Sequence, residues 1–66
     1  MTVSQQRVLE ALADRPMSAR GVAHHTNTPI RYVQHSLDAL YRRSLVTLDG
    51  RGWTITDRGR EKKAAA

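Results

Sequence analysis

The sequence predicts a mainly α-helical domain in which three helices are followed by a small β-hairpin and a short C-terminal helical segment. Apolar residues first recur at three- and four-residue spacing, which is typical of helices that bury one face. A run of strand-forming residues around an Asp-Gly turn then indicates a hairpin. With 66 residues there is room for one small core, so we expect a single domain over residues 1–66.

The composition limits the classes of function. The chain has no cysteine, which removes disulfides and thiolate metal sites and fits a reducing compartment. No apolar stretch approaches the ~20 residues that span a bilayer, so we expect a cytoplasmic protein with no membrane partner. Eleven Lys and Arg against six Asp and Glu give a formal charge of +5, and the positive residues gather in the second half of the sequence. This charge favours a polyanionic partner.

The first helix is expected over about residues 3–14. Thr2 followed three residues later by Gln5 has the form of a capping box. The helix should end before Pro16, because the residue that precedes a proline is pushed out of the helical region. Its buried face would carry Val8, Leu9, Leu12 and Ala13.

A short second helix is expected over about residues 18–25. Ser18 is a suitable N-cap, and Val22 and Ala23 would point inward. Gly21 weakens this helix by about 0.5–1 kcal/mol relative to alanine, so it needs tertiary support. Met17, in the turn before it, is expected to be buried.

The third and longest helix is expected over about residues 28–43. Thr28 would cap it and Pro29 would occupy its first helical position, where the missing N–H does no harm. Arg42 and Arg43 lie in its last turn, where cations complement the helix dipole. One stripe of the helix is apolar and is expected to face the core: Ile30, Val33, Leu37, Leu40 and Tyr41.

A hairpin is expected over about residues 45–56. Two short strands flank the sequence Asp-Gly-Arg-Gly, which begins at Asp49. An isolated two-stranded ribbon is marginal in water, so one face must rest on the helices. Trp53 is expected to hold the hairpin against the third helix.

The remaining segment, residues 57–66, is basic. Thr56 would cap a short helix in it, with an acidic residue in the first turn and lysines in the last. Gly59 weakens the expectation of a helix.

The order of these elements resembles the winged helix-turn-helix of bacterial regulators of the MarR, ArsR and IclR type. In those proteins the third helix is the recognition helix and the hairpin is the wing. The resemblance covers nearly the whole chain, and it departs at Gly21 and at Ser44, which stands where a glycine usually ends the recognition helix. The matching residues are Met17-Ser18, Val22-Ala23, Thr28, Val33, Leu37, Leu40, Leu45-Val46 and Ile55-Thr56-Asp57-Arg58-Gly59.

The resemblance implies a sequence-specific double-stranded DNA-binding protein, a small regulator of transcription of the repressor kind. The recognition helix would lie in the major groove, where the N-terminal part of such a helix normally meets base edges. Arg31 suits the two acceptors of guanine, and Gln34 suits adenine. The candidate base-contacting residues are Thr28, Arg31, Tyr32, Gln34 and His35.

A second group of cations would hold the DNA backbone. Arg51, between two glycines at the tip of the hairpin, suits a narrow minor groove or a flanking phosphate. The alternative is that the glycines only make the turn and that Arg51 is solvated. The other candidate phosphate contacts are Arg42, Arg43, Arg58 and Arg60.

Other functions stay open or find little support. Size and charge also fit a phage excisionase-like architectural DNA-binding protein, and the same fold could serve as a protein-interaction module. A homodimer, or an oligomer assembled on DNA, is compatible with either DNA-binding role. No nucleophile, carboxylate pair or phosphate-cradling loop points to an enzyme. His24 and His25 diverge on a helix and have no partner at zinc-ligand spacing, so no metal, cofactor or small-molecule ligand is expected.

Overall fold

A computed structural model describes residues 1–65 of the chain; Ala66, the last residue of the predicted basic segment, lies outside the described residues. The described part contains four helices and one antiparallel hairpin, as the sequence predicts. The elements are α1 (Val3–Asp14), α2 (Ala19–Thr26), α3 (Ile30–Arg42), β1 (Val46–Asp49), β2 (Gly52–Ile55) and α4 (Asp57–Ala65).

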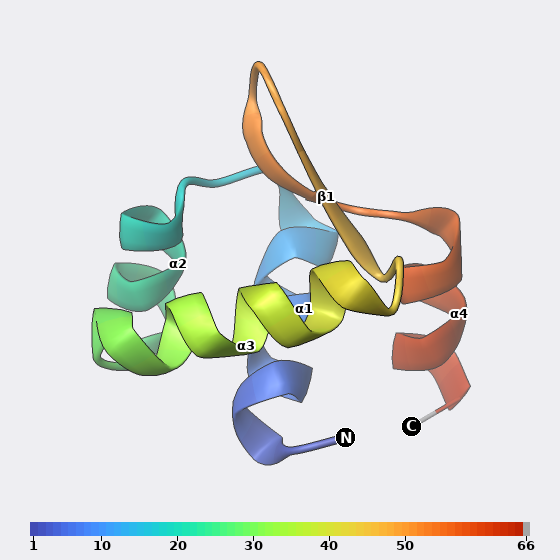
Figure 1. Cartoon of the computed structure of the whole chain (residues 1–66), viewed down its shortest axis with the longest axis horizontal. Coiled ribbons are helices and arrows are strands. Elements are labelled where there is room, and N and C mark those ends of the chain that lie inside the picture. Colours follow the sequence, from blue (N-terminus) through green and yellow to red (C-terminus); the bar gives the residue numbers. More distant parts are fainter. Residues whose placement is uncertain (66) are drawn as a thin grey trace.

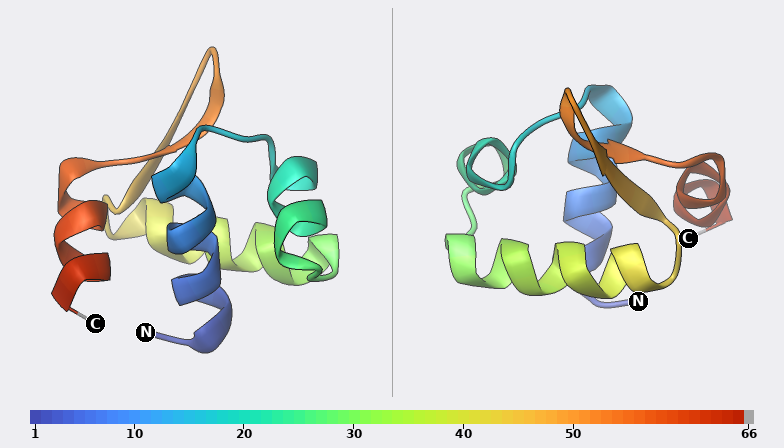
Figure 2. Two further views of the ribbon diagram at one scale, coloured as in Figure 1. Left: turned by 180° about the vertical axis from the view of Figure 1, so that it is seen from behind. Right: turned by 45° about the horizontal axis from the view of Figure 1, so that its top comes forward.

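Helix α1 lies in the middle of the molecule and the other helices pack around it. Helix α3 crosses α1 on one side, with α2 near its first turn and α4 beyond its last (Figure 1). The hairpin rises on the opposite side of the molecule from the N-terminus and the last described turn of α4 (Figures 1 and 2). One side of α3 is therefore covered, while its outward side is open.

The ends of α1 and the start of α2 form as predicted. The Thr2 hydroxyl accepts a hydrogen bond from the backbone N–H of Gln5 at 3.1 Å. Arg15 is extended, with φ −167° and ψ 160°, as expected before a proline. The Ser18 hydroxyl caps α2 by accepting from Gly21 N–H at 3.0 Å.

Helix α3 does not begin as predicted. The expectation that Thr28 caps it is wrong, because Pro29 occupies the N-cap position and no side chain caps the helix. Asn27 ends α2 in the left-handed conformation, and Thr28 N–H then donates to the carbonyl of Ala23 at 3.0 Å. The Thr28 hydroxyl also turns back and donates to the carbonyl of Thr26 at 3.2 Å. Thr28 therefore completes the end of α2 instead of starting α3.

Ser44 ends α3 in the geometry that usually selects glycine. It has a φ of +62°, and its N–H donates to the carbonyl of Tyr41 at 3.0 Å. Leu45 N–H donates to the carbonyl of Leu40 at 2.9 Å, so the two bonds form a Schellman motif. Serine in place of glycine leaves the shape of this turn intact.

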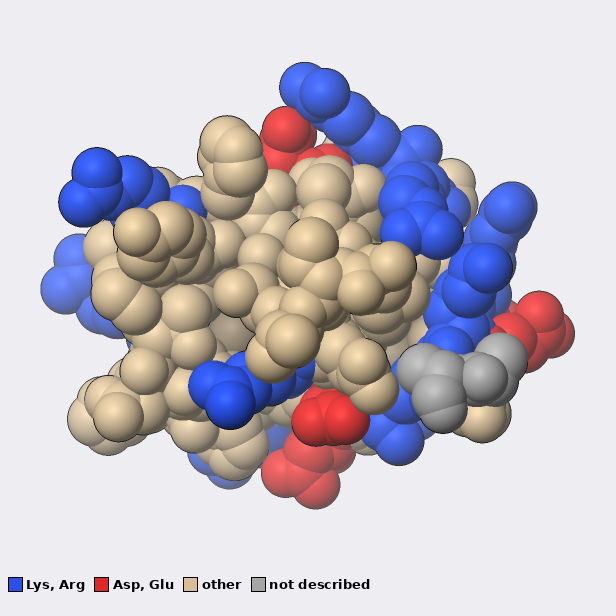
Figure 3. Space-filling view, turned by 90° about the horizontal axis from the view of Figure 1, so that it is seen from below, with Lys and Arg blue, Asp and Glu red and all other residues tan. Residues whose placement is uncertain are grey.

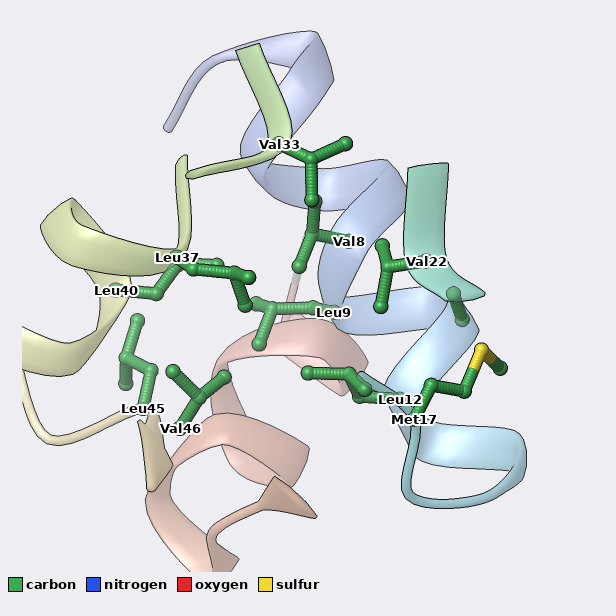
Figure 4. Close-up of a cluster of buried hydrophobic side chains, with 11 residues drawn as sticks. Val8, Leu9, Leu12, Met17, Val22, Val33, Leu37, Leu40, Leu45 and Val46 are labelled. Atoms are coloured by element: carbon green, nitrogen blue, oxygen red, sulfur yellow. The ribbon is translucent and has the colours of Figure 1, made fainter. Parts of the chain in front are cut away.

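The core lies between α1, α3 and the base of the hairpin. Figure 4 shows that its side chains come from both halves of the chain. Predicted members such as Met17, Val22 and Val33 are buried. The full set is Val8, Leu9, Ala11, Leu12, Met17, Val22, Val33, Leu37, Leu40, Leu45 and Val46.

Two residues predicted on the buried stripe of α3 are exposed. Ile30, the first residue of α3, is 41% exposed, and Tyr41 is 54% exposed. Tyr41 lies at the edge of the stripe, where its ring meets Trp53 edge-on with a centroid separation of 6.0 Å. Trp53 is half-buried and packs against the core, consistent with its predicted role.

A third segment of backbone, at Met17, pairs with the hairpin and joins it to the helices. Val46 pairs with Ile55 and Asp49 with Gly52, so the turn consists of Gly50 and Arg51. On its other edge, β2 forms a bridge to Met17: Trp53 N–H donates to Met17 O at 2.8 Å and Met17 N–H donates to Trp53 O at 3.1 Å. Gly52, with φ +108°, is required here, because a Cβ would lie 2.8 Å from the carbonyl oxygen of Met17.

Helix α4 is anchored to the turn after α3. The Thr56 hydroxyl accepts from Gly59 N–H at 3.0 Å, which confirms the predicted cap, and it donates to the carbonyl of Ser44 at 2.7 Å. A Cβ on Gly59 would overlap the carbonyl oxygen of Leu45 and lie 2.8 Å from Ile55 Cγ1. Gly59, which weakened the sequence-based expectation of this helix, therefore allows it to pack closely.

We expect Ser44→Gly to stabilise the domain by about 1 kcal/mol, because glycine adopts a positive φ without the steric cost that serine carries. Urea unfolding measures the difference. Asn27→Gly is the matched control at the other left-handed position, and it should gain less, since asparagine tolerates this region better. Equal or lower stability of Ser44→Gly would contradict strain at this turn.

Gly59→Ala should lower the free energy of unfolding by about 1–3 kcal/mol, because its Cβ enters space held by backbone. Gly50→Ala is the control: a Cβ there meets nothing within 4 Å, and we expect a change within about 0.5 kcal/mol. The two variants are compared by thermal and urea unfolding. Similar stability of both would show that α4 does not depend on this close approach.

Candidate nucleic-acid interface

The outward face of α3 consists of exposed polar residues. Val33, Leu37 and Leu40 bury the opposite side, which fixes the rotation of the helix. Arg31 and His35 project outward one turn apart, and both are exposed. The face continues through Asp38 and Arg42, also exposed. Because these side chains are not needed for the core, they are available to a partner.

The other predicted base-contacting residues lie beside this face. Gln34 and Tyr32 are exposed on opposite flanks, and Tyr32 has 56% of its surface exposed. The guanidinium carbon of Arg31 lies 5.9 Å from the centre of the Tyr32 ring, a cation–π arrangement. Thr28, half-buried and held by the end of α2, lies before the helix and not on its outward face.

An acidic residue that the sequence analysis did not assign to the site lies among the cations. Asp38 Oδ2 is 3.2 Å from Arg42 Nη2, across one turn of α3. Both side chains are well exposed, so this pair contributes little to stability. It does hold the Arg42 guanidinium along the helix. Arg43, at the end of α3, is exposed.

A similar pair lies at the tip of the hairpin. Asp49 accepts hydrogen bonds from the backbone N–H of Arg51 at 2.8 Å and from its guanidinium at 3.1 Å. The hydrogen bond from the Arg51 side chain lowers the pKa of the Asp49 carboxyl below its ordinary value. Arg51 thus remains exposed, with its guanidinium turned toward Asp49.

A shallow cleft separates α3 from the hairpin. The exposed ring of Tyr41 and the half-buried ring of Trp53 form its aromatic wall, and Gln34 and Asp38 supply its polar groups. Ala19, at the start of α2, and Leu37 complete the lining. The cleft therefore lies beside the outward face of α3 and forms one continuous surface with it.

The basic residues do not all gather on one face. Arg58 and Arg60 are exposed on α4, which packs against α1 and β2. Seen from below, Lys and Arg side chains lie mainly at the side occupied by α4, with smaller groups elsewhere on the rim (Figure 3). Arg51 shares a groove with Arg60, on the far side of the hairpin from the cleft next to α3.

The described residues contain no group of three or more His, Asp or Glu side chains arranged to hold a metal ion. Within the same part of the chain, no helix combines the length and apolar character needed to cross a membrane.

Comparison with known proteins gives matches of fold. No protein-family model and no curated protein matches the sequence. A solved structure of a protein with unknown function from Listeria innocua Clip11262 is similar with a TM-score of 0.85 and 29% identity, over 97% of this chain and 49% of that one. ZitR from Lactococcus lactis is similar with a TM-score of 0.85 and 20% identity, over 98% of this chain and 49% of its own.

The chain spans about half the length of each of these two proteins. The similarity extends over all four helices and the hairpin, since nearly all of this chain is aligned. In this fold the hairpin is the wing. The chain therefore has a winged helix fold, shared over nearly its whole length with ZitR.

Proposed function

We propose that this chain is a sequence-specific double-stranded DNA-binding domain of a small transcriptional regulator, of the repressor kind. Helix α3 would enter the major groove, and the wing would contact the neighbouring backbone or minor groove. The observation that carries the proposal is the outward face of α3, which is exposed and basic and contributes nothing to the core. The winged helix fold supports it, because that fold presents this helix to a partner.

The dimensions of α3 suit the major groove. Its 13 residues extend about 20 Å, and the groove of B-DNA admits one helix. Arg31 and His35 are separated by about 6 Å along the helix axis, close to two base-pair steps of about 3.4 Å. Gln34 lies on the flank next to the cleft. These residues can therefore reach neighbouring base pairs from one docked position.

The electrostatics of the domain would favour approach to a polyanion. The formal charge is +5, and basic residues lie on α3, on the wing and on α4. The two exposed acids on α3 and at the wing tip are each paired with an arginine, which reduces their repulsion of phosphates. Long-range attraction would then speed the encounter, while base contacts would determine the site.

We further propose that two copies bind neighbouring half-sites, which would make a repressor site roughly palindromic. Half-sites read by such helices lie one helical turn of DNA apart, or a multiple of it. Footprints on selected sites distinguish this arrangement from scattered architectural binding of the excisionase kind. Single, unpaired sites would contradict the pairing without contradicting DNA binding.

Arg31→Ala should relax the preference at one or two base pairs, because a bidentate arginine–guanine contact contributes about 1–3 kcal/mol of discrimination. Selection of bound duplexes from a random pool, with wild type and variant in parallel, measures the change. Arg7→Ala is the control, since Arg7 is exposed on α1 and not on the outward face of α3. An equal loss of affinity on every sequence would contradict base reading by Arg31.

The affinity for a duplex should fall steeply with salt. If about five phosphates are contacted, the slope of log affinity against log salt should lie near −4 to −5. Fluorescence anisotropy of a labelled duplex at several salt concentrations measures the slope. A shallow slope, together with tight and salt-insensitive binding to a protein, would contradict the proposed function and favour a protein-interaction module.

A further inference from the structure

A groove behind the wing brings together three arginines from separate parts of the chain. Arg15 follows α1, Arg51 lies in the turn of the wing and Arg60 lies on α4. In the view from behind, α1 and α4 lie side by side below the hairpin (Figure 2, left). The groove is lined by Leu12, Asp14, Arg15, Pro16, Arg51, Thr54, Ile55 and Arg60.

Two of the three arginine side chains have a hydrogen bond that orients them, and the backbone places the third. Arg15 is extended and lies two residues before Met17, whose backbone is bonded to β2. Arg60 Nη1 donates to the carbonyl of Ala13 at 3.5 Å, which directs its side chain toward the end of α1. The hydrogen bonds to Asp49 orient Arg51. Three arginines from separate parts of the chain thus line one groove.

The lining of the groove carries an excess of positive charge. Three of its lining residues are arginines and one, Asp14, is an aspartate. Its floor is buried: Leu12 is 1% and Thr54 8% exposed. Cations held next to one another repel, and an anion placed between them removes the repulsion. Guanidinium forks match the oxygens of a phosphate better than any other side chain does.

We propose that this groove binds a phosphate group through Arg15, Arg51 and Arg60. The sequence predicts Arg51 and Arg60 as separate contacts to the DNA backbone, and it does not predict a role for Arg15. The groove makes the three residues one site, distinct from the outward face of α3. The phosphate has two possible sources: the DNA backbone beyond the base pairs met by α3, or a small phosphorylated molecule. The first source rests on the proposed function, and the second does not.

Asp49 would tune this site. Its carboxylate already occupies part of the Arg51 fork, so an incoming phosphate must share or displace it. Asp49→Asn retains an oxygen that accepts from Arg51 N–H and removes the competing charge. This variant should therefore bind phosphate more tightly than the wild type while keeping the turn of the wing.

The first experiment titrates the isotope-labelled full chain with inorganic phosphate at constant ionic strength, followed by NMR. The Nε–H signals of Arg15, Arg51 and Arg60 should move together along one saturating curve. Arg15→Ala should weaken binding about tenfold, as expected for loss of one charge-assisted hydrogen bond. Arg7→Ala, which removes the same charge from α1, should leave the affinity within about twofold. Asp49→Asn should strengthen it about two- to fivefold.

Two results would overturn the proposal. One is a set of Nε–H chemical-shift changes that do not saturate or that are equal at all arginines. Such changes would indicate general charge screening only. The other is equal weakening by Arg15→Ala and Arg7→Ala, which would show that only net charge matters. Unfolding curves recorded for each variant establish that the compared chains are folded.

A second experiment identifies the source of the phosphate. If DNA supplies it, Arg15→Ala should reduce the salt slope for a selected duplex by about 0.9, the value for one phosphate contact, and Arg7→Ala should not. In the alternative outcome, Arg15→Ala leaves the salt slope for the duplex unchanged while inorganic phosphate still binds saturably to the wild type. That result would support the site and assign it to a small phosphorylated molecule. Absence of duplex binding by the wild type would overturn the proposed function. The phosphate titration would still show whether the groove binds phosphate.

Discussion

The reversal of the chain at Ser44 and Leu45 is the constraint on which the rest of the structure depends. Leu45 N–H closes the end of α3, its buried side chain joins the core, and its carbonyl accepts from Thr56 N–H at 3.1 Å. The Ser44 carbonyl accepts from the Thr56 hydroxyl, and Gly59 packs against Leu45. The end of α3, the start of the wing and the cap of α4 thus share one pair of residues, so their relative orientation is set together.

This junction determines what the molecule presents to a partner. The end of α3 is fixed and the helix packs on α1, so its orientation about its own axis is set. In this orientation Arg31 and His35 lie outside the core. The bridge between Met17 and Trp53 holds the wing from the other side, which leaves the cleft next to α3 open. Helix and wing therefore behave as parts of one rigid surface, and a duplex would meet a preformed shape. Preorganisation of this kind lowers the ordering cost of binding.

Two surfaces of this small domain carry arginines in different surroundings. The outward face of α3 carries cations interleaved with polar groups, and its Arg42 is held by Asp38. The groove behind the wing gathers Arg51 with Arg15 and Arg60. A face that mixes hydrogen-bonding groups suits discrimination between bases, whereas a groove of guanidinium groups suits phosphate, which carries no sequence information. If DNA supplies the phosphate, the two proposed sites would perform complementary tasks on one polyanion.

The sequence by itself determined the order and nature of the elements, because caps such as Thr2, Ser18 and Thr56 act within a few residues and helical spacing marks the buried face of α3. The exposure of nine of the ten candidate residues likewise followed from their polarity, Thr28 being half-buried. Only the tertiary structure decided that Trp53 meets the exposed ring of Tyr41 and that Arg15 lines the same groove as Arg51 and Arg60. These outcomes depend on contacts between residues distant in the chain, which local spacing does not encode.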